Sequence, residues 1–242
     1  MIPKTIHYCW FGRNPLPKDA LRCIESWRKF LPDYEIKEWN EDNFDVQAIP
    51  YVAEAYEAKK YAFVSDYVRF AVLYREGGVY FDTDVEIIRP MDDVLRKGAF
   101  MGLEANGTDK DAIAVAPGLG IAAEAGHPLY SAFLQRYETL HFRVENGTQS
   151  ESMIPIITAL FTERGLHPSD TPQEVDGITI YPAEYFNPLD DATGRLRITS
   201  NTRSIHWFSA TWLPTQSPWL RTLKRYLRRL FGKNLRKRLH LG

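Results

Sequence analysis

The hydrophobic positions along the chain alternate between short runs typical of strands and longer stretches with a helical period. Residues 5–10 and the alternating segment 34–39 predict two strands, and residues 17–30 between them place apolar side chains at helical spacing. This alternation is typical of an α/β fold with a mainly parallel sheet. We expect further helices over 52–60, 61–76, 91–97, 127–140 and 151–163, and further strands over 79–81, 85–88, 99–103, 112–116, 178–182 and 203–207.

The segment Gly-Gly-Val-Tyr-Phe-Asp-Thr-Asp at residues 77–84 combines a turn signal, a short apolar strand and two carboxylates. Residues i and i+2 of a strand face the same side, so we expect Asp82 and Asp84 to converge. Because two nearby carboxylates repel, a divalent cation such as Mn²⁺ or Mg²⁺, which also binds substrate phosphate oxygens, would suit this position. A turn with two solvated aspartates is the alternative interpretation.

The predicted helix over residues 61–76 is apolar nearly all round, which indicates a buried helix. Apart from Ser65, its only strongly polar residues before the last turn are Asp66 and Arg69, which are spaced i, i+3 and share a face. Buried charges are costly unless they are paired or bound to a ligand. Two interpretations stay open: an internal ion pair, or the wall of a polar cavity shared with the two aspartates.

Composition places the chain among ordinary globular proteins, with 44% hydrophobic and 25% charged residues in a length of 242. The two cysteines, Cys9 and Cys23, lack metal-ligand spacing and favour a reducing cytosol over a disulfide framework. We expect no signal peptide, because the N-terminus lacks a basic and then apolar leader. The sequence contains no stretch of about 18 apolar residues, so we expect no membrane-spanning helix.

Charge is distributed unevenly, although the net charge is only −1. Residues 219–242 contain nine Lys or Arg and no acidic residue, which leaves 21 basic and 31 acidic residues in 1–218. We therefore divide the chain into a globular domain, 1–218, and a basic tail, 219–242. The tail has the pattern of a basic amphipathic helix, which is typical of proteins that bind an anionic membrane surface. A helix packed on the acidic body is the alternative; a nucleic-acid arm is disfavoured, because no recognition module accompanies it.

Three further positions are candidates for ligand contacts. Trp10 ends the first predicted strand and begins the turn that leaves it, and ligands of open α/β sheets bind beyond the carboxyl ends of strands. Its indole is therefore placed to stack on a nucleotide base, or else it packs in the core. Gly118 permits a close approach of backbone to a sugar, or simply forms a turn. His206 ends the last predicted strand, where a lone histidine is usually structural.

Four ordered motifs together resemble the DXD-containing sugar-transferase family, which groups fungal initiating mannosyltransferases with bacterial capsule and lipopolysaccharide transferases and is related to clostridial glucosylating toxins. They are Ile-His-Tyr-Cys-Trp-Phe-Gly at 6–12, Ser-Asp-x-x-Arg at 65–69, Gly-Gly-x-Tyr-x-Asp-x-Asp at 77–84, and His-Trp-x-x-x-Thr-Trp at 206–212. The resemblance covers most of residues 1–212, and the ordered set is far more specific than the Asp-x-Asp pair alone.

This resemblance implies a GT-A type nucleotide-sugar-binding fold with a mixed, mainly parallel sheet, to which the basic amphipathic C-terminal helix is added. It implies metal-dependent transfer of a hexose, with retention of anomeric configuration, from a nucleotide sugar to a glycan or lipid-linked acceptor. The expected donor is a UDP-hexose, with GDP-mannose as the alternative. The expected setting is cell-surface polysaccharide synthesis, in the cytoplasm and peripheral at the inner face of the membrane.

The resemblance also implies roles for individual residues. Asp82 and Asp84 would bind Mn²⁺ or Mg²⁺ and the donor diphosphate, and His206 would complete the metal shell. Arg69 would orient the donor through a forked contact. The remaining roles are a sugar or ribose contact for Asp66, base stacking for Trp10, and diphosphate contacts for Thr211 and Trp212.

Two other classes of protein remain as alternatives. A metal-dependent phosphotransferase or nuclease with two metals usually needs more acidic residues around the pair than this chain shows. A non-catalytic nucleotide-sugar-binding module would not need a cation site. Metal-dependent hydrolysis of a donor sugar distinguishes these classes.

Overall fold

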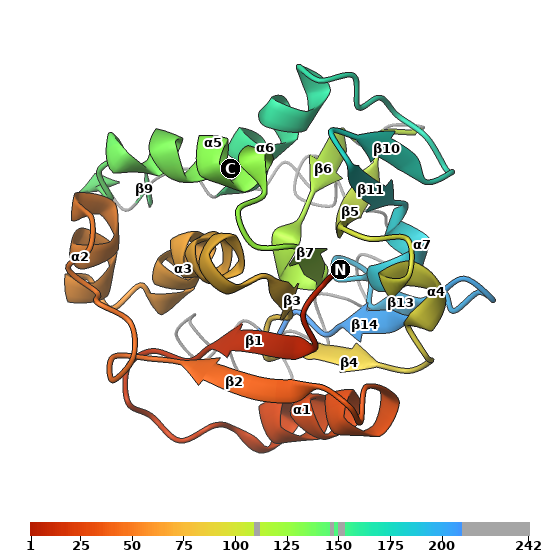
Figure 1. The fold of residues 1–242 in the computed structure, drawn as a ribbon, viewed down its shortest axis with the longest axis horizontal. Helices are drawn as coiled ribbons and strands as arrows, with labels where there is room; N and C mark the ends of the chain where they lie inside the picture. Colours follow the sequence, from red (N-terminus) through yellow and green to blue (C-terminus); the bar gives the residue numbers. More distant parts are fainter. Residues whose placement is uncertain (109–111, 146–147, 150–152, 210–242) are drawn as a thin grey trace, which may run out of the picture.

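The computed structural model describes residues 1–108, 112–145, 148–149 and 153–209, and an eight-stranded mixed sheet organises them (Figure 1). The strand order is β10-β11-β5-β7-β3-β1-β2, and β6 pairs with β5 beside this path. The expected α/β fold class is confirmed. The strands of the sheet are β1 (Thr5–Cys9), β2 (Glu35–Trp39), β3 (Gly78–Tyr80), β5 (Phe100–Asn106), β6 (Ile113–Val115), β7 (Ile121–Ala123), β10 (Gln173–Val175) and β11 (Ile178–Tyr181).

Most strands of this sheet run in one direction. β1 is parallel to β2 and β3, while β7 is antiparallel to both β3 and β5. Because β11 is parallel to β5, the strands β2, β1, β3, β5 and β11 share one direction, and β6, β7 and β10 oppose it. The expected mixed, mainly parallel sheet is therefore confirmed. The carboxyl ends of β1, β3 and β5 consequently lie along the same edge of the sheet.

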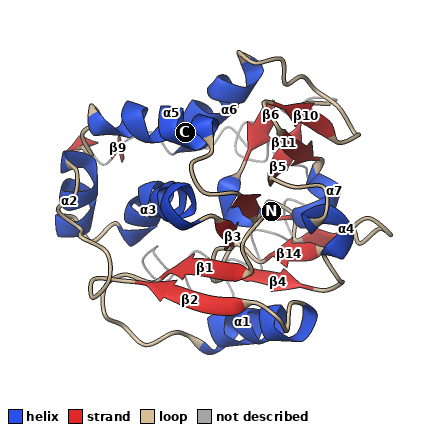
Figure 2. Cartoon of the chain, viewed as in Figure 1, coloured by secondary structure: helices blue, strands red, loops and turns tan. Residues whose placement is uncertain are grey.

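Helices cover both faces of the sheet (Figure 2). Successive residues of a strand point to opposite faces, so Val79 belongs to one apolar core and Tyr80 to the other. The helices are α1 (Lys18–Phe30), α2 (Pro50–Glu57), α3 (Tyr61–Glu76), α4 (Asp92–Leu95), α5 (Pro128–Glu138), α6 (Met153–Thr162) and α7 (Ala183–Phe186). The smaller elements are β4 (Val85–Ile87) paired with β14 (Ser204–His206), β8 (Val144–Glu145) with β9 (Thr148–Gln149), β12 (Leu189–Asp190) with β13 (Arg195–Leu196), and a 3₁₀ turn over Pro117–Leu119.

The helix α3 is buried along most of its length, as its apolar sequence predicts, and two glycines connect it to β3. Gly77 and Gly78 both have positive φ, at 67° and 110°. A Cβ on Gly78 would lie only 2.6 Å from the carbonyl oxygen of Thr5. Glycine at these positions therefore allows the chain to turn from a buried helix directly into a central strand.

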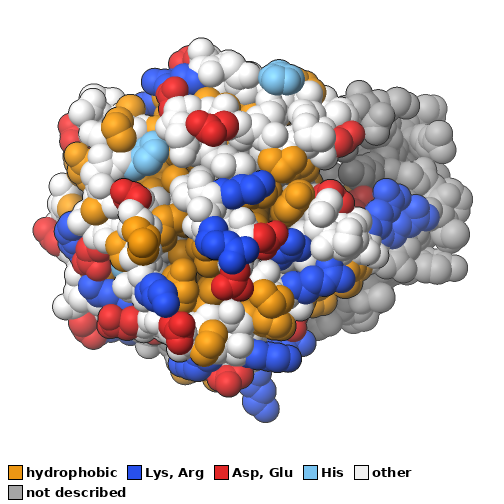
Figure 3. All heavy atoms as spheres, turned by 45° about the vertical axis from the view of Figure 1, so that its right-hand side comes forward, with side chains coloured by type: hydrophobic (Ala, Val, Ile, Leu, Met, Phe, Trp, Pro, Cys, Tyr) orange, Lys and Arg blue, Asp and Glu red, His pale blue; other side chains and the backbone are white. Residues whose placement is uncertain are grey.

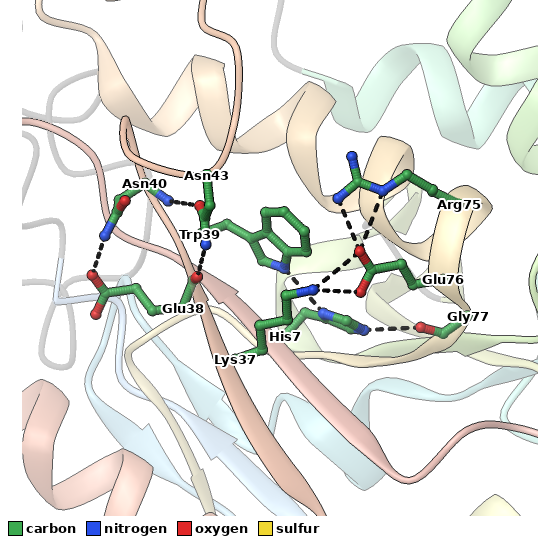
Figure 4. Close-up of polar contacts among 9 residues, drawn as sticks. All are labelled: His7, Lys37, Glu38, Trp39, Asn40, Asn43, Arg75, Glu76 and Gly77. Carbon is green, nitrogen blue, oxygen red and sulfur yellow. Dashed lines mark hydrogen bonds and ion pairs between the residues drawn. The ribbon is translucent and has the colours of Figure 1, made fainter.

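A polar network around His7 joins β1, β2 and the end of α3 (Figure 4). The Trp39 indole donates to His7 Nδ1 at 3.0 Å, and His7 Nε2 lies 2.9 Å from the Gly77 carbonyl oxygen, to which it donates. Lys37 lies 4.3 Å above the Trp39 ring and donates to Glu76 at 2.8 Å. Burial lowers the pKa of His7, so the neutral ring fixes the backbone just before β3.

The charged tail over 219–242 and the boundary at residue 218 lie outside the described residues. In the described part of the chain, no helix is long and apolar enough to cross a membrane. Figure 3 shows one face of the molecule, on which Lys and Arg side chains are interspersed with Asp and Glu.

Candidate active site

Asp82 and Asp84 do not lie on a strand, contrary to the expectation from their spacing. β3 ends at Tyr80, and both aspartates occupy the turn that leads into β4. The amide of Val85 closes this turn by donating to the Asp82 carbonyl oxygen at 3.0 Å. The alternation of a pleated strand is therefore the wrong reason for their convergence, which comes from the turn itself.

The turn brings both carboxylates to His206. β14 runs antiparallel to β4, with His206 opposite Val85, so the histidine lies beside the turn. One oxygen of Asp82, one oxygen of Asp84 and one ring nitrogen of His206 all lie within 4.8 Å of one another. The structure thus brings together the three side chains that the sequence assigned to a metal.

Asp84 and His206 form an ion pair that is about five-sixths buried. Asp84 Oδ1 lies 3.1 Å from His206 Nε2, and Asp84 Oδ2 accepts from the Ser209 amide at 2.8 Å. Burial acts to raise the pKa of Asp84, but His206 and the amide hold that pKa below its usual value. Burial acts to lower the pKa of His206, yet the nearby carboxylates raise it. The two groups favour each other's charged forms, and a cation bound there would compete with a proton for the His206 ring nitrogen.

Arg69 connects the cluster to Asp66. Its Nη2 atom lies 3.1 Å from Asp66 Oδ1 and 3.2 Å from Asp82 Oδ1, and its side chain is only 6% exposed. Its Nε donates to the Ser65 carbonyl oxygen at 3.0 Å, which fixes the guanidinium on α3. The ion pair expected between Asp66 and Arg69 is present, and it extends to Asp82. The internal ion pair of the first interpretation is thus present, and it reaches one of the two aspartates.

The environment of this array alters the ionisation of its members. Burial raises the pKa of Asp66 to about 6, although Arg69 opposes the shift. Burial would lower the pKa of Arg69, but Asp82 and other neighbours raise it, so the guanidinium stays charged. A fixed guanidinium in a partly buried site favours the oxygen atoms of a phosphate or a sugar hydroxyl.

Tyr80 is a site residue that sequence reasoning assigned no role. Its hydroxyl donates to Asp82 Oδ1 at 2.8 Å, and its ring lies under the Arg69 guanidinium at 5.1 Å. Burial, followed by the charge of Asp82, raises the pKa of Tyr80 well above 10, so the phenol remains a donor. The sequence signal that could have indicated this contact is the position of Tyr80 two residues before the first aspartate.

The backbone of Gly118 packs against Asp82. Its carbonyl oxygen accepts from the Asp82 amide at 3.2 Å. A Cβ at this position would overlap Asp82 Oδ2 and lie 3.1 Å from Arg69 Nη1. The close approach at Gly118 is therefore to the aspartate, whereas the sequence suggested an approach to a sugar or a simple turn.

Trp10 lies just beyond the carboxyl end of β1, as expected from the sequence. Its backbone amide donates to the Trp39 carbonyl oxygen at 2.9 Å, and its indole donates to the Asn14 carbonyl oxygen at 2.6 Å. The ring is half-buried against the core and keeps part of its surface accessible. Thr211 and Trp212 lie outside the described residues.

Fold and site together define an α/β protein with a compact Asp-Asp-His cluster at the sheet edge where such folds bind ligands. Two carboxylates and one imidazole suit a divalent cation that accepts both oxygen and nitrogen ligands. The described residues therefore fit the metal that the sequence implies.

Comparison with known proteins supports the family resemblance. Residues 17–101 match the family described as "Glycosyltransferase sugar-binding region containing DXD motif". This match includes α1, α3, both glycines and both aspartates. The resemblance found from the motifs is confirmed, and residues 17–101 are similar to the sugar-binding region of that glycosyltransferase family.

Individual relatives match parts of the chain. Inositol phosphoceramide mannosyltransferase 3 of Schizosaccharomyces pombe is 32% identical over 104 residues, which are 41% of this chain and 29% of that protein. Inositol phosphoceramide mannosyltransferase 1 of the same organism is 29% identical over 151 residues, 57% of this chain and 46% of that protein. The chain thus spans less than half the length of these curated relatives. The alignment with the solved structure of PaToxG Glycosyltransferase covers 57% of this chain and 63% of that structure's chain, with 21% identity and a TM-score of 0.44.

Proposed function

We propose that the protein is a metal-dependent hexosyltransferase that uses a nucleotide-sugar donor. The observation that carries this proposal is the convergence of Asp82, Asp84 and His206 within 4.8 Å, beside the Asp66–Arg69 pair. The family match over residues 17–101, which contains both aspartates, supports the same class of reaction.

Asp82, Asp84 and His206 would hold a divalent cation, with Mn²⁺ or Mg²⁺ as the candidates. Bound there, the cation supplies Lewis-acid neutralisation of the charge on the leaving diphosphate. Arg69 donates from its guanidinium to the donor sugar or phosphate, and Asp66 accepts from sugar or ribose hydroxyls. Tyr80 keeps Asp82 in place by donating to it. The half-buried indole of Trp10 stacks on the nucleotide base.

The reaction is transfer with retention by front-face attack. The oxygen of an acceptor hydroxyl forms a bond to the anomeric carbon while the bond from that carbon to the diphosphate oxygen breaks. The hydroxyl proton leaves with the diphosphate. A UDP-hexose is the favoured donor, and the mannosyltransferase names of two relatives support GDP-mannose as the alternative.

The acceptor is a glycan or a lipid-linked glycan of cell-surface polysaccharide synthesis, for which capsule and lipopolysaccharide are candidates. The basic segment over 219–242 would bring the protein to an anionic membrane surface at the inner face, because each surface Lys or Arg is attracted by about 1 kcal/mol. Co-sedimentation with anionic vesicles at low and high salt tests this placement. A chain ending at Pro218 that sediments as well as the full chain would exclude the tail as the anchor.

The function itself is tested by donor hydrolysis in the absence of acceptor. UDP-glucose, UDP-galactose, UDP-N-acetylglucosamine and GDP-mannose are each incubated with the full chain in Mn²⁺, Mg²⁺ or EDTA, and free nucleoside diphosphate is measured. We expect one donor to be hydrolysed with a metal and not in EDTA. Release of inorganic phosphate or cleavage of a nucleic acid would favour the phosphotransferase or nuclease alternative. Donor binding without hydrolysis would favour the binding module.

A further inference from the structure

Glu104 lies at an irregularity of β5. Leu103 pairs with Val115 and Ala105 pairs with Ala114, so Glu104 is an extra residue opposite a single step of β6. Such a β-bulge redirects the side chain of the extra residue, and bulges are frequent beside active sites. β5 runs in the same direction as β3, so the bulge lies toward the edge where the aspartates follow β3.

The Glu104 carboxylate lies within electrostatic reach of the metal cluster. Its charge contributes to the raised pKa of His206. The side chain is accessible to solvent, yet the surrounding protein removes enough water to raise the pKa of Glu104 itself, while His206 opposes this shift. Glu104 is thus accessible to solvent and close enough to His206 for the two charges to interact.

The backbone of Glu104 is held, whereas its carboxylate is available. Asn187, at the end of α7, donates from Nδ2 to the Glu104 carbonyl oxygen at 3.2 Å. The Asn187 amide in turn donates to the Ala183 carbonyl oxygen at 2.7 Å. Among the described residues, no side chain forms a hydrogen bond or ion pair with the Glu104 carboxylate. A fixed backbone with an accessible, unpaired carboxylate is suited to binding a ligand hydroxyl.

We propose that Glu104 is a catalytic residue that accepts a hydrogen bond from the attacking hydroxyl and aims its oxygen at the anomeric carbon. The inference rests on the proposed function and adds the residue that receives the acceptor. The hydroxyl belongs to a sugar acceptor during transfer and to water during donor hydrolysis. Its oxygen bonds to the anomeric carbon as the bond to the diphosphate breaks, and its proton shifts from the hydrogen bond with Glu104 to an oxygen of the leaving diphosphate. Glu104 accepts the hydrogen bond and takes up no proton in the step.

Glu104→Gln keeps the size of the side chain and removes the charge of the acceptor group. We expect kcat for metal-dependent donor hydrolysis to fall roughly tenfold or more, the loss expected for one charge-assisted hydrogen bond. The donor KM should stay within about twofold of the wild-type value, because the substitution changes the contact with the attacking water and not with the donor. The Tm should stay within about 2 °C of the wild-type value. Glu104→Asp should recover part of the rate.

Glu174→Gln is the matched control, because Glu174 is an exposed glutamate on β10 of the same sheet. It should leave kcat, KM and Tm unchanged. A Glu104→Gln protein with wild-type kcat would overturn the assignment of Glu104, while the proposed function would stand. A higher donor KM with unchanged kcat would place Glu104 at the donor instead. If the wild-type protein hydrolyses none of UDP-glucose, UDP-galactose, UDP-N-acetylglucosamine and GDP-mannose with Mn²⁺ or Mg²⁺, both proposals fail together.

Discussion

Gly118→Ala adds one methyl group against the carboxylate that connects Arg69 to the metal cluster. The added Cβ would overlap Asp82 Oδ2 and lie 3.1 Å from both Asp82 Cγ and Arg69 Nη1. Because Cβ contacts under 3.0 Å are essentially never found, the carboxylate must move by about 1 Å. Gly118 does not have positive φ, so alanine itself fits the backbone.

The expected consequence is a large loss of catalysis with a small loss of stability. A displacement of about 1 Å in a reacting group costs on the order of 100-fold in rate. The carboxylate is 28% exposed and has room to rotate, so we expect the free energy of unfolding to fall by only about 1 kcal/mol. The assay is metal-dependent donor hydrolysis at saturating donor, with the apparent Kd for Mn²⁺ measured in parallel.

Gly126→Ala is the control for the conformational cost of alanine alone. Gly126 has φ of 75°, and nothing lies within 4 Å of the position that an alanine methyl group would take, so this variant should lose stability and keep its activity. If Gly118→Ala retains wild-type activity and Mn²⁺ affinity, the position of Asp82 is not set by this contact. If Gly118→Ala loses as much free energy of unfolding as a variant with a cavity in the core, the contact is structural rather than catalytic.

Three further predictions concern the metal, the base and pH. Asp84→Asn should reduce hydrolysis by roughly 100-fold or more and abolish stabilisation by Mn²⁺ in thermal melts, because it removes a ligand charge; substantial Mn²⁺-dependent turnover would exclude Asp84 as a ligand. Trp10→Ala should weaken donor binding by about 1–3 kcal/mol in calorimetry, and unchanged donor affinity with a lower Tm would return Trp10 to the core. Stability should fall as pH drops below about 6.5, by at most about 1.4 kcal/mol per pH unit, because the unfolded chain binds a proton at His7 that the folded chain refuses. Urea unfolding of the wild type and His7→Gln measures this slope, and an equal slope in both would assign it to another group.

Local sequence signals were sufficient for most of the fold. The apolar, helix-length segment 61–76 predicted a buried helix, and Gly77 and Gly78 predicted the turn after it. Both signals are local, because a buried helix is visible in its own residues and glycine itself permits positive φ. The strand β7 was missed because Ile-Ala-Ala is too short and too weak in strand preference to be distinguished from a turn.

The candidate site was only partly accessible to the same reasoning. The spacing of Asp82 and Asp84 suggested convergence, but on a strand rather than in the turn that the structure shows. The contact of Gly118 with Asp82 and the bulge at Glu104 arise from pairing between distant segments. Such contacts leave no local periodicity, so only the folded arrangement reveals them.

The most direct test of a cation held by Asp82, Asp84 and His206 is calorimetric titration of UDP and GDP into the full chain, with Mn²⁺ and then with EDTA. In the proposed function the donor diphosphate binds beside both carboxylates, so binding without a cation would place like charges together. We predict micromolar binding of one nucleoside diphosphate in Mn²⁺ and roughly 100-fold weaker binding in EDTA. Equal affinity with and without the metal would contradict the central claim.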